Sequence, residues 1–275
     1  MLVLDSGIGG LGVVAELRAL RPGLAIAYLA DTAGFPYGER APDDLVRHLV
    51  ALLTRAIAVI APRLVVLACN TASVVALAAL RARFDLPFVG CVPAIKWAAS
   101  LSRTRCFGLL ATPATVARPY VADLVARFAP DCTVHAHGAR HLASLAERRF
   151  LGTPPPPGAV AAELDGLLSQ PGADRIDTVV LGCTHYRLLL PELARAAPPG
   201  VTWLDPAPAV ARRVCFLLDA TPGFVPPRLP RVNAVAFVTA PPDRPRELAR
   251  RLLAFGFASL RLLDVAIPPR LAPAR

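Results

Sequence analysis

The sequence has little lysine, few aromatic residues and no long run of charge. Lys96 is the only lysine, so arginine supplies nearly all of the 30 basic residues, which face 20 acidic ones. Aromatic residues make up 6% of the 275 positions, which is few for a protein that binds nucleic acid by base stacking. The net charge of +10 is spread over scattered arginines. We therefore interpret it as a solvated surface, disfavour nucleic acid as a partner, and keep DNA binding as the non-enzymatic alternative.

The chain also lacks the features of a secreted or membrane protein. Residues 1–5 show neither the basic region nor the long apolar segment of a signal peptide. The uncharged stretch 64–80 contains Asn70, Thr71 and Ser73, whereas a membrane span needs about 20 mostly apolar residues. We expect a cytoplasmic protein with reduced thiols and no membrane partner.

The six cysteines include no Cys-x-x-Cys pair, the strongest sequence sign of a zinc or dithiol site. Four of them lie within or beside apolar runs, and we expect these to be small core residues: Cys91, Cys106, Cys132 and Cys215. Three histidines have metal-like spacing without a supporting cysteine or acid, and we interpret them as loop and helix-start residues: His135, His137 and His141. The sequence thus predicts no metal site and leaves Cys69 and Cys183 to be explained.

Apolar residues, by contrast, are abundant at 55%, enough to bury a substantial core. Short apolar runs alternate with segments of helical spacing, which predicts an α/β fold with parallel sheets. The clearest helix is 42–60, where Pro42 suits the first position and Asp43 and Asp44 complement the helix dipole. The expected strands are 2–4, 25–30, 64–68, 87–91, 106–110, 133–136, 177–182, 201–204 and 232–239. After a proline-rich loop over 221–230 and the last strand, we expect a helix from 244 and an irregular tail.

Cys69 and Cys183 stand in matched settings. The apolar run Leu64–Ala68 leads into Cys69, and Asp177–Gly182 leads into Cys183, so each thiol follows a buried strand. Open α/β sheets place their ligands at the carboxyl ends of such strands. The repeated pattern predicts an internal duplication that gives two similar α/β units.

A pair of thiols suggests proton transfer at a carbon atom. A thiol on each side of a carbon acid can remove a proton from one face and return one to the other. One cysteine must then be a thiolate while the other is a thiol, so their surroundings must differ. Asp5, on the first strand, and His185, two residues after Cys183, are the natural proton relays.

The glycine-rich stretch offers an alternative from another reaction class. Gly7–Gly12 fits G-x-G-x-x-G between a strand and a helix, with Asp31 about 20 residues later, as in an NAD-type dinucleotide-binding oxidoreductase. Asp5 would oppose a pyrophosphate at this position. The two strand-end cysteines would also have no role, so we keep this interpretation as the alternative.

Four motifs closely resemble those of the glutamate racemase family in order and spacing: Asp5–Gly10, Gly34–Gly38, Ala68–Ser73 and Leu181–Tyr186. The resemblance spans nearly the whole chain. It implies a cofactor-independent interconversion of L- and D-glutamate that supplies D-glutamate for peptidoglycan. His185 after Cys-Thr, and Ser73 after Cys-Asn-Thr-Ala, resemble the glutamate branch of the wider superfamily. A related racemase acting on a different amino acid remains the alternative within that superfamily.

The resemblance also implies roles for individual residues. Cys69 and Cys183 would be the acid–base pair, with Asp5 assisting the first, and His185 and Glu147 the second. Substrate glutamate would bind to residues of both halves: Asp5, Ser6, Pro36, Tyr37, Gly38, Cys69, Asn70, Thr71, Cys183, Thr184 and His185.

Together with the duplication, the resemblance implies an architecture. We expect an α/β protein of two pseudo-symmetric parallel-sheet units, the first formed by residues 1–98 with 206–275 and the second by residues 99–205. The active site would lie in the cleft between them. Oligomeric state varies in the family, so the sequence leaves it open, with a homodimer among the states considered.

Overall fold

The computed structural model describes residues 1–220 and 234–265. They form two compact units, one made of Met1–Cys91 and the segment from Ala207 onward, the other of Val92–Pro206. The first division lies before helix α4 (Ile95–Leu101), whereas the sequence-based division at residue 98 falls inside that helix. Three expected segments lie wholly or partly outside the described residues. They are the proline-rich loop over 221–230, the first two residues of the strand over 232–239, and residues 266–275 of the irregular tail.

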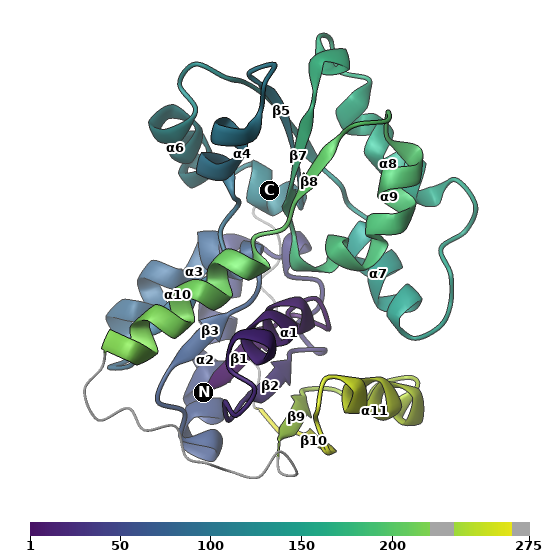
Figure 1. The fold of residues 1–275 in the computed structure, drawn as a ribbon. Coiled ribbons are helices and arrows are strands. Elements are labelled where there is room, and N and C mark those ends of the chain that lie inside the picture. Colours follow the sequence, from purple (N-terminus) through teal and green to yellow (C-terminus); the bar gives the residue numbers. More distant parts are fainter. Residues whose placement is uncertain (221–233, 266–275) are drawn as a thin grey trace. The chain divides into compact units, whose positions relative to one another are not determined.

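The first unit contains a six-stranded parallel sheet (Figure 1). Its strands lie in the order β10 (Ser259–Leu262), β9 (Val235–Val238), β2 (Ala27–Ala30), β1 (Leu2–Asp5), β3 (Val65–Leu67) and β4 (Phe88–Gly90). The helices of this unit are α1 (Leu11–Leu20), the 3₁₀ helix η1 (Tyr37–Glu39), α2 (Pro42–Ile60), α3 (Asn70–Arg83), α10 (Ala207–Ala220) and α11 (Pro245–Ala254). Strand β10 corrects the expectation of an irregular tail, because residues 259–262 pair in parallel with β9.

The second unit contains a four-stranded parallel sheet in the order β6 (Thr133–Gly138), β5 (Cys106–Ala111), β7 (Thr178–Gly182) and β8 (Thr202–Leu204). Its helices are α4, α5 (Pro113–Val116), α6 (Pro119–Phe128), α7 (Leu142–Phe150), α8 (Ala159–Leu168), the 3₁₀ helices η2 (Ala173–Arg175) and η3 (Thr184–Leu189), and α9 (Leu190–Ala196). The strand order repeats β2-β1-β3-β4 of the first unit. The predicted α/β fold with two parallel-sheet units is confirmed, and β3 and β7 occupy equivalent places.

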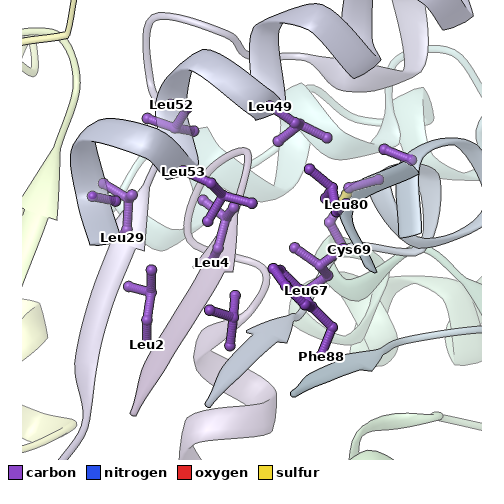
Figure 2. Packing of buried hydrophobic residues seen from close by; sticks show 14 of the residues in the cluster. Leu2, Leu4, Leu29, Leu49, Leu52, Leu53, Leu67, Cys69, Leu80 and Phe88 are labelled. Atoms are coloured by element: carbon purple, nitrogen blue, oxygen red, sulfur yellow. The ribbon is translucent and has the colours of Figure 1, made fainter. Parts of the chain in front are cut away.

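The core of the first unit packs helix α2 against the central strands (Figure 2). Leu49, Leu52 and Leu53 of α2 and Leu4 of β1 are each at most 1% exposed. Full burial of one such leucine side chain stabilises a fold by about 1.5–3 kcal/mol. Cys69 belongs to the same cluster, so its strand end is anchored in the core.

Helix α2 has the bounds that its sequence predicts. It begins with Pro42 at the first position, with Asp43 and Asp44 in the first turn. It ends where Ala61 adopts a left-handed conformation with φ 47°. The length of the helix is therefore set by local signals, and its buried face by the 3.6-residue spacing of the leucines.

The uncharged stretch 64–80 forms strand β3 and most of helix α3. Within residues 1–220 and 234–265, no helix has both the length and the apolar character that crossing a bilayer requires.

Candidate active site

Cys69 lies between the end of β3 and the start of α3. Its backbone is extended (φ −136°, ψ 123°), and its carbonyl oxygen accepts the first hydrogen bond of the helix, from Ser73 N at 3.0 Å. The residue is 5% exposed. A thiol at the N-terminus of a 14-residue helix is placed where the helix dipole favours the thiolate.

Asp5 ends the neighbouring strand β1 and braces the glycine-rich turn. The fully buried carboxylate accepts a hydrogen bond from Gly10 N at 3.0 Å, at the start of α1. A methyl group at Gly10 would lie 2.9 Å from Asp5 Cβ and 3.0 Å from Ala68 Cβ, so glycine permits this close approach. The carboxylate thus occupies a helix N-terminus that a dinucleotide would use for its pyrophosphate, which argues against the dinucleotide interpretation.

The residues beside these two are buried as well. Ser6, Asn70 and Thr71 are 4%, 1% and 3% exposed. The Asn70 Oδ1 atom lies 3.5 Å from the Cys91 thiol, which can donate to it. Within the described part of the chain, Asn70 Nδ2 is buried without a hydrogen-bond partner, and is therefore a donor available to a ligand.

Tyr37 begins η1, between the half-buried residues Pro36 and Gly38. It is 1% exposed, and its hydroxyl donates to Asp31 Oδ2 at 2.6 Å. Burial and the charge of Asp31, with smaller contributions from Cys69 and Asp5, hold the pKa of Tyr37 well above its usual value. The phenol is therefore neutral, and its proton points to Asp31.

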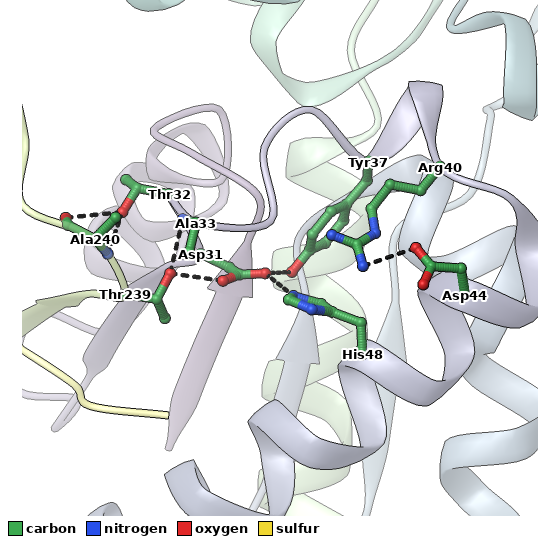
Figure 3. Close-up of polar contacts among 9 residues, drawn as sticks. All are labelled: Asp31, Thr32, Ala33, Tyr37, Arg40, Asp44, His48, Thr239 and Ala240. Carbon is green, nitrogen blue, oxygen red and sulfur yellow. Dashed lines mark hydrogen bonds and ion pairs between the residues drawn. The ribbon is translucent and has the colours of Figure 1, made fainter. Parts of the chain in front are cut away.

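Asp31, directly after β2, is the centre of a buried polar cluster (Figure 3). Its Oδ2 atom bonds the Tyr37 hydroxyl and His48 Nε2, and its Oδ1 atom accepts from Thr239 Oγ1 at 2.6 Å. Burial alone would raise the pKa of Asp31. The hydrogen bonds from His48, Thr239 and Tyr37, together with the charge of His48, outweigh burial and hold that pKa below its usual value. Asp31 is therefore a carboxylate at neutral pH.

Cys183 occupies the equivalent place in the second unit, between β7 and η3. Its backbone conformation (φ −146°, ψ 131°) is close to that of Cys69, and it is 7% exposed. The thiol lies 3.9 Å from His185 Nδ1, and His185 Nε2 lies 2.9 Å from Glu147 Oε1 of α7. Thiol, imidazole and carboxylate therefore form a chain along which a proton can move.

Thr184 and Tyr186, in the turn that follows Cys183, are both buried. Thr184, the next residue, is 5% exposed. The buried hydroxyl of Tyr186 lies 3.1 Å from the Ala111 carbonyl oxygen and 2.9 Å from that of Ala139. This contact ties the η3 turn to the carboxyl ends of β5 and β6, so the position of Cys183 depends on three adjacent strands.

The two thiols share a backbone geometry but differ in their surroundings. Cys69 precedes an α-helix of 14 residues and lies in a region that contains the buried acids Asp5 and Asp31. Cys183 precedes a 3₁₀ helix of six residues and has an imidazole in reach. Unequal surroundings are what a pair of proton-transfer groups with opposite protonation states requires.

The structure therefore gathers the predicted site residues into two groups, one in each unit. Asp5, Ser6, Pro36, Tyr37, Gly38, Cys69, Asn70 and Thr71 belong to the first group, and Glu147, Cys183, Thr184 and His185 to the second. Asp31 stands out in the sequence only as the acid of the dinucleotide alternative. Its place at a strand end beside Asp5 was the available signal, whereas nothing in the sequence marks His48 or Thr239.

The remaining cysteines and histidines lie elsewhere. None of the six cysteines, all of which lie in the described part of the chain, forms a disulfide bond. Cys91 and Cys106 are buried as expected, but Cys132 and Cys215 are only partly buried. His135 Nδ1 lies 3.3 Å from Gln170 Oε1, and the largely exposed side chain of His141 bonds Glu163 Oε1. Among residues 1–220 and 234–265, no group of three or more histidine, cysteine or acidic side chains could hold a metal ion.

Comparisons of the sequence with known proteins point to one family. A family model described as Asp/Glu/Hydantoin racemase matches residues 12–214. The chain is 50% identical over 272 residues to a glutamate racemase of Granulibacter bethesdensis, covering 97% of each chain. It is 44% identical over 262 residues to a glutamate racemase of Sphingopyxis alaskensis, covering 94% of this chain and 96% of that protein.

Solved structures agree with this. A crystal structure of Escherichia coli glutamate racemase, in complex with L-glutamate and an activator, matches with a TM-score of 0.88 and 40% identity, covering 96% of this chain and 97% of the other. Glutamate racemase RacE1 of Bacillus anthracis matches with a TM-score of 0.80 and 25% identity, covering 97% and 98%. None of these relatives favours the dinucleotide interpretation.

Proposed function

Because the chain belongs to the Asp/Glu/hydantoin racemase family, we propose that it interconverts L- and D-glutamate by two-base proton transfer. The observation that supports the mechanism is the repetition of one geometry. In each unit, the third strand of the repeated order leads into a buried cysteine with an extended backbone at a helix start.

In the proposed reaction, the two cysteines act on opposite faces of the substrate Cα. The thiolate of one takes the Cα proton, and the electron pair left on carbon is shared with the substrate carboxylate. The thiol of the other cysteine then gives its proton to the opposite face, which inverts the centre. The roles exchange for the other enantiomer, so each turnover moves one proton in and one proton out.

The assisting residues differ between the two sides. On the Cys183 side, His185 can accept the thiol proton, and Glu147, 2.9 Å from the other ring nitrogen, stabilises the imidazolium that forms. On the Cys69 side, Asp5 and the N-terminus of α3 act in opposite directions. The helix end favours the thiolate, and the nearby carboxylate disfavours it, which keeps both protonation states accessible.

Neutral donors would bind the substrate carboxylates. The buried Nδ2 atom of Asn70 is available. The hydroxyls of Thr71 and Thr184 follow Cys69 and Cys183 closely in the sequence, and the hydroxyl of Ser6 follows Asp5. Pro36 and Gly38 flank Tyr37 in the loop of the first group. Neutral donors bind the carboxylates without taking part in the proton transfer, and no cofactor is called for.

The product would be D-glutamate for peptidoglycan synthesis. Both cysteines must stay reduced for the reaction, which is the condition of the cytoplasm. The relatives that cover nearly the whole chain are glutamate racemases, so we propose glutamate in preference to another amino acid.

The proposal predicts that Cys69→Ala and Cys183→Ala each lower the racemisation rate by at least about 10³-fold, because either change removes one of two required proton-transfer groups. Circular dichroism on L- and D-glutamate measures the rate, and thermal unfolding checks the fold. Cys132→Ala, which removes a thiol outside the candidate site, is the matched control and should behave as wild type.

Isotope exchange separates this mechanism from a one-base route. In heavy water, wild type should place deuterium at Cα of the product enantiomer from its first turnovers, since the second thiol exchanges with solvent. Product that retains the substrate-derived proton, or near-normal turnover by either cysteine variant, would contradict the two-base mechanism.

A further inference from the structure

A buried polar cluster adjoins the Cys69 side, and the proton transfer proposed above gives it no role. It consists of Asp31, Tyr37, His48 and Thr239, which come from four separate segments of the first unit (Figure 3). Asp31 and His48 are fully buried and Tyr37 is 1% exposed. Burying a charge costs stability unless hydrogen bonds compensate it, so four converging polar groups call for an explanation.

The charge of Asp31 determines which atoms carry protons. An ionised carboxylate can only accept hydrogen bonds, so Tyr37, His48 and Thr239 must all donate to it. His48 therefore carries a proton on Nε2. The Thr239 hydroxyl donates its hydrogen bond to Asp31, and its oxygen accepts one from Ala33 N at 2.9 Å. Every orientation in the cluster follows from the one carboxylate.

The backbone closes over the cluster at Gly34. A methyl group there would lie 2.2 Å from Asp31 Oδ2, 2.6 Å from His48 Nε2 and 2.8 Å from Tyr37 Cε1. Gly34 N also donates to the Asp31 carbonyl oxygen at 3.0 Å. The loop that carries Tyr37 is thus packed directly on the three side chains that orient the phenol.

Tyr37 connects the cluster to the reacting thiol. Its ring belongs to the same buried cluster as Cys69, and the charges of Cys69 and Asp5 both act on its hydroxyl. A phenol beside a thiol could donate to the thiolate or give a proton to the substrate carbon. Its proton, however, is directed to Asp31, so toward Cys69 the phenol oxygen offers only its lone pairs.

We propose that Asp31, oriented by His48 and Thr239, is a positioning residue that directs the Tyr37 proton away from Cys69. Toward the substrate, the phenol oxygen then offers only a hydrogen-bond acceptor, which suits the ammonium group of an amino acid. The Cys69 thiol is the sole proton donor on its face of the substrate. This inference rests on the proposed function and assigns a task to residues outside the acid–base pair.

A double-mutant cycle tests whether Asp31 acts through Tyr37. Asp31→Asn and Tyr37→Phe should each lower kcat/KM for glutamate by about 10- to 100-fold, through misplaced groups at the reacting centre. The double variant should have a kcat/KM no lower than that of the less active single variant, since both changes remove the same Tyr37–Asp31 hydrogen bond. The proposal would be overturned if the losses of the two single variants multiplied in the double variant, or if Asp31→Asn left kcat/KM unchanged.

The controls separate positioning from stability. His48→Gln should lower kcat/KM, whereas His135→Gln, which removes a buried histidine bonded to Gln170 in the second unit, should change stability without changing kcat/KM. If Asp31→Asn does not fold, Thr239→Val takes its place in the cycle, because it removes one donor and keeps the charge. Equal kinetic losses in His48→Gln and His135→Gln would overturn the proposal.

A spectroscopic measurement on the wild type is independent of turnover. ¹⁵N-histidine NMR, assigned with His48→Gln, should show a proton on His48 Nε2. A His48 signal without that proton would overturn the inference about Asp31, even if the protein racemised glutamate. Failure of the wild type to racemise glutamate, with that proton present, would instead overturn the proposed function.

Discussion

Asp31 is a carboxylate in a fully buried position, and its ionisation is tied to stability. Burial raises its pKa, but the hydrogen bonds and the charge of His48 hold the pKa below the ordinary value of 3.8. A carboxyl group with a lowered pKa in the folded state stabilises the fold above its unfolded-state pKa. That contribution disappears as pH falls through the folded-state value.

We therefore expect Asp31→Asn to be less stable than wild type by about 1–3 kcal/mol at pH 7, because charge-assisted hydrogen bonds are lost. The difference should narrow below a pH of about 4, where the unfolded chain takes up the proton. Urea unfolding at pH 7 and at acidic pH measures both values. A difference that is the same at every pH would show that the charge of Asp31 does not contribute.

At the same scale, the sequence predicts the two thiols but not the cluster. Cys69 and Cys183 each end a recognisable apolar run, so local pattern suffices to find them. The Asp31 contacts join residues 17 positions away in His48 and 208 positions away in Thr239. No local pattern encodes such pairings, because they depend on which strands become neighbours in the sheet.

Among the elements, helix α2 and strand β10 show what local sequence can determine. Helix α2 has proline, acids and leucine spacing within its own residues, and its predicted bounds are confirmed. Strand β10 has no such signal. Two of its four residues are half-buried and two are exposed, so none of them is a buried residue that a strand pattern would mark. It exists through its pairing with β9, a tertiary interaction that a single-sequence pattern does not contain.

The leucine face of α2 should contribute more to stability than any exposed residue of that helix. We expect Leu53→Ala to lower the free energy of unfolding by about 3 kcal/mol, since a fully buried side chain leaves a cavity. Val59→Ala, at a position that is 46% exposed on the same helix, is the control and should change it by less than about 0.5 kcal/mol. Urea unfolding compares the two. Equal effects would contradict the packing of α2 on the sheet.

For the whole molecule, the two units repeat a strand order but not a chain path. The order β2-β1-β3-β4 recurs as β6-β5-β7-β8. The matched settings of the two cysteines in the sequence predict such a repeat. The first sheet, however, is completed by β9, which pairs with β2 after the chain has built the second unit. The sequence shows the repeat because each copy is local, whereas the return of the chain leaves no local trace.

This difference in chain path predicts a difference in autonomy. The second unit is continuous, Val92–Pro206, with its own sheet and a buried cluster that includes Phe107, Leu109 and Val180. We expect a fragment of residues 92–206 to fold alone, with an α/β circular dichroism spectrum and cooperative urea unfolding. It should not racemise glutamate, because it carries Cys183 but lacks Cys69. A fragment of residues 1–91 is the control: it lacks β9, β10 and α10, leaves β2 at an open sheet edge, and should not unfold cooperatively. Cooperative folding of the 1–91 fragment, or its absence in the 92–206 fragment, would contradict this division of the chain.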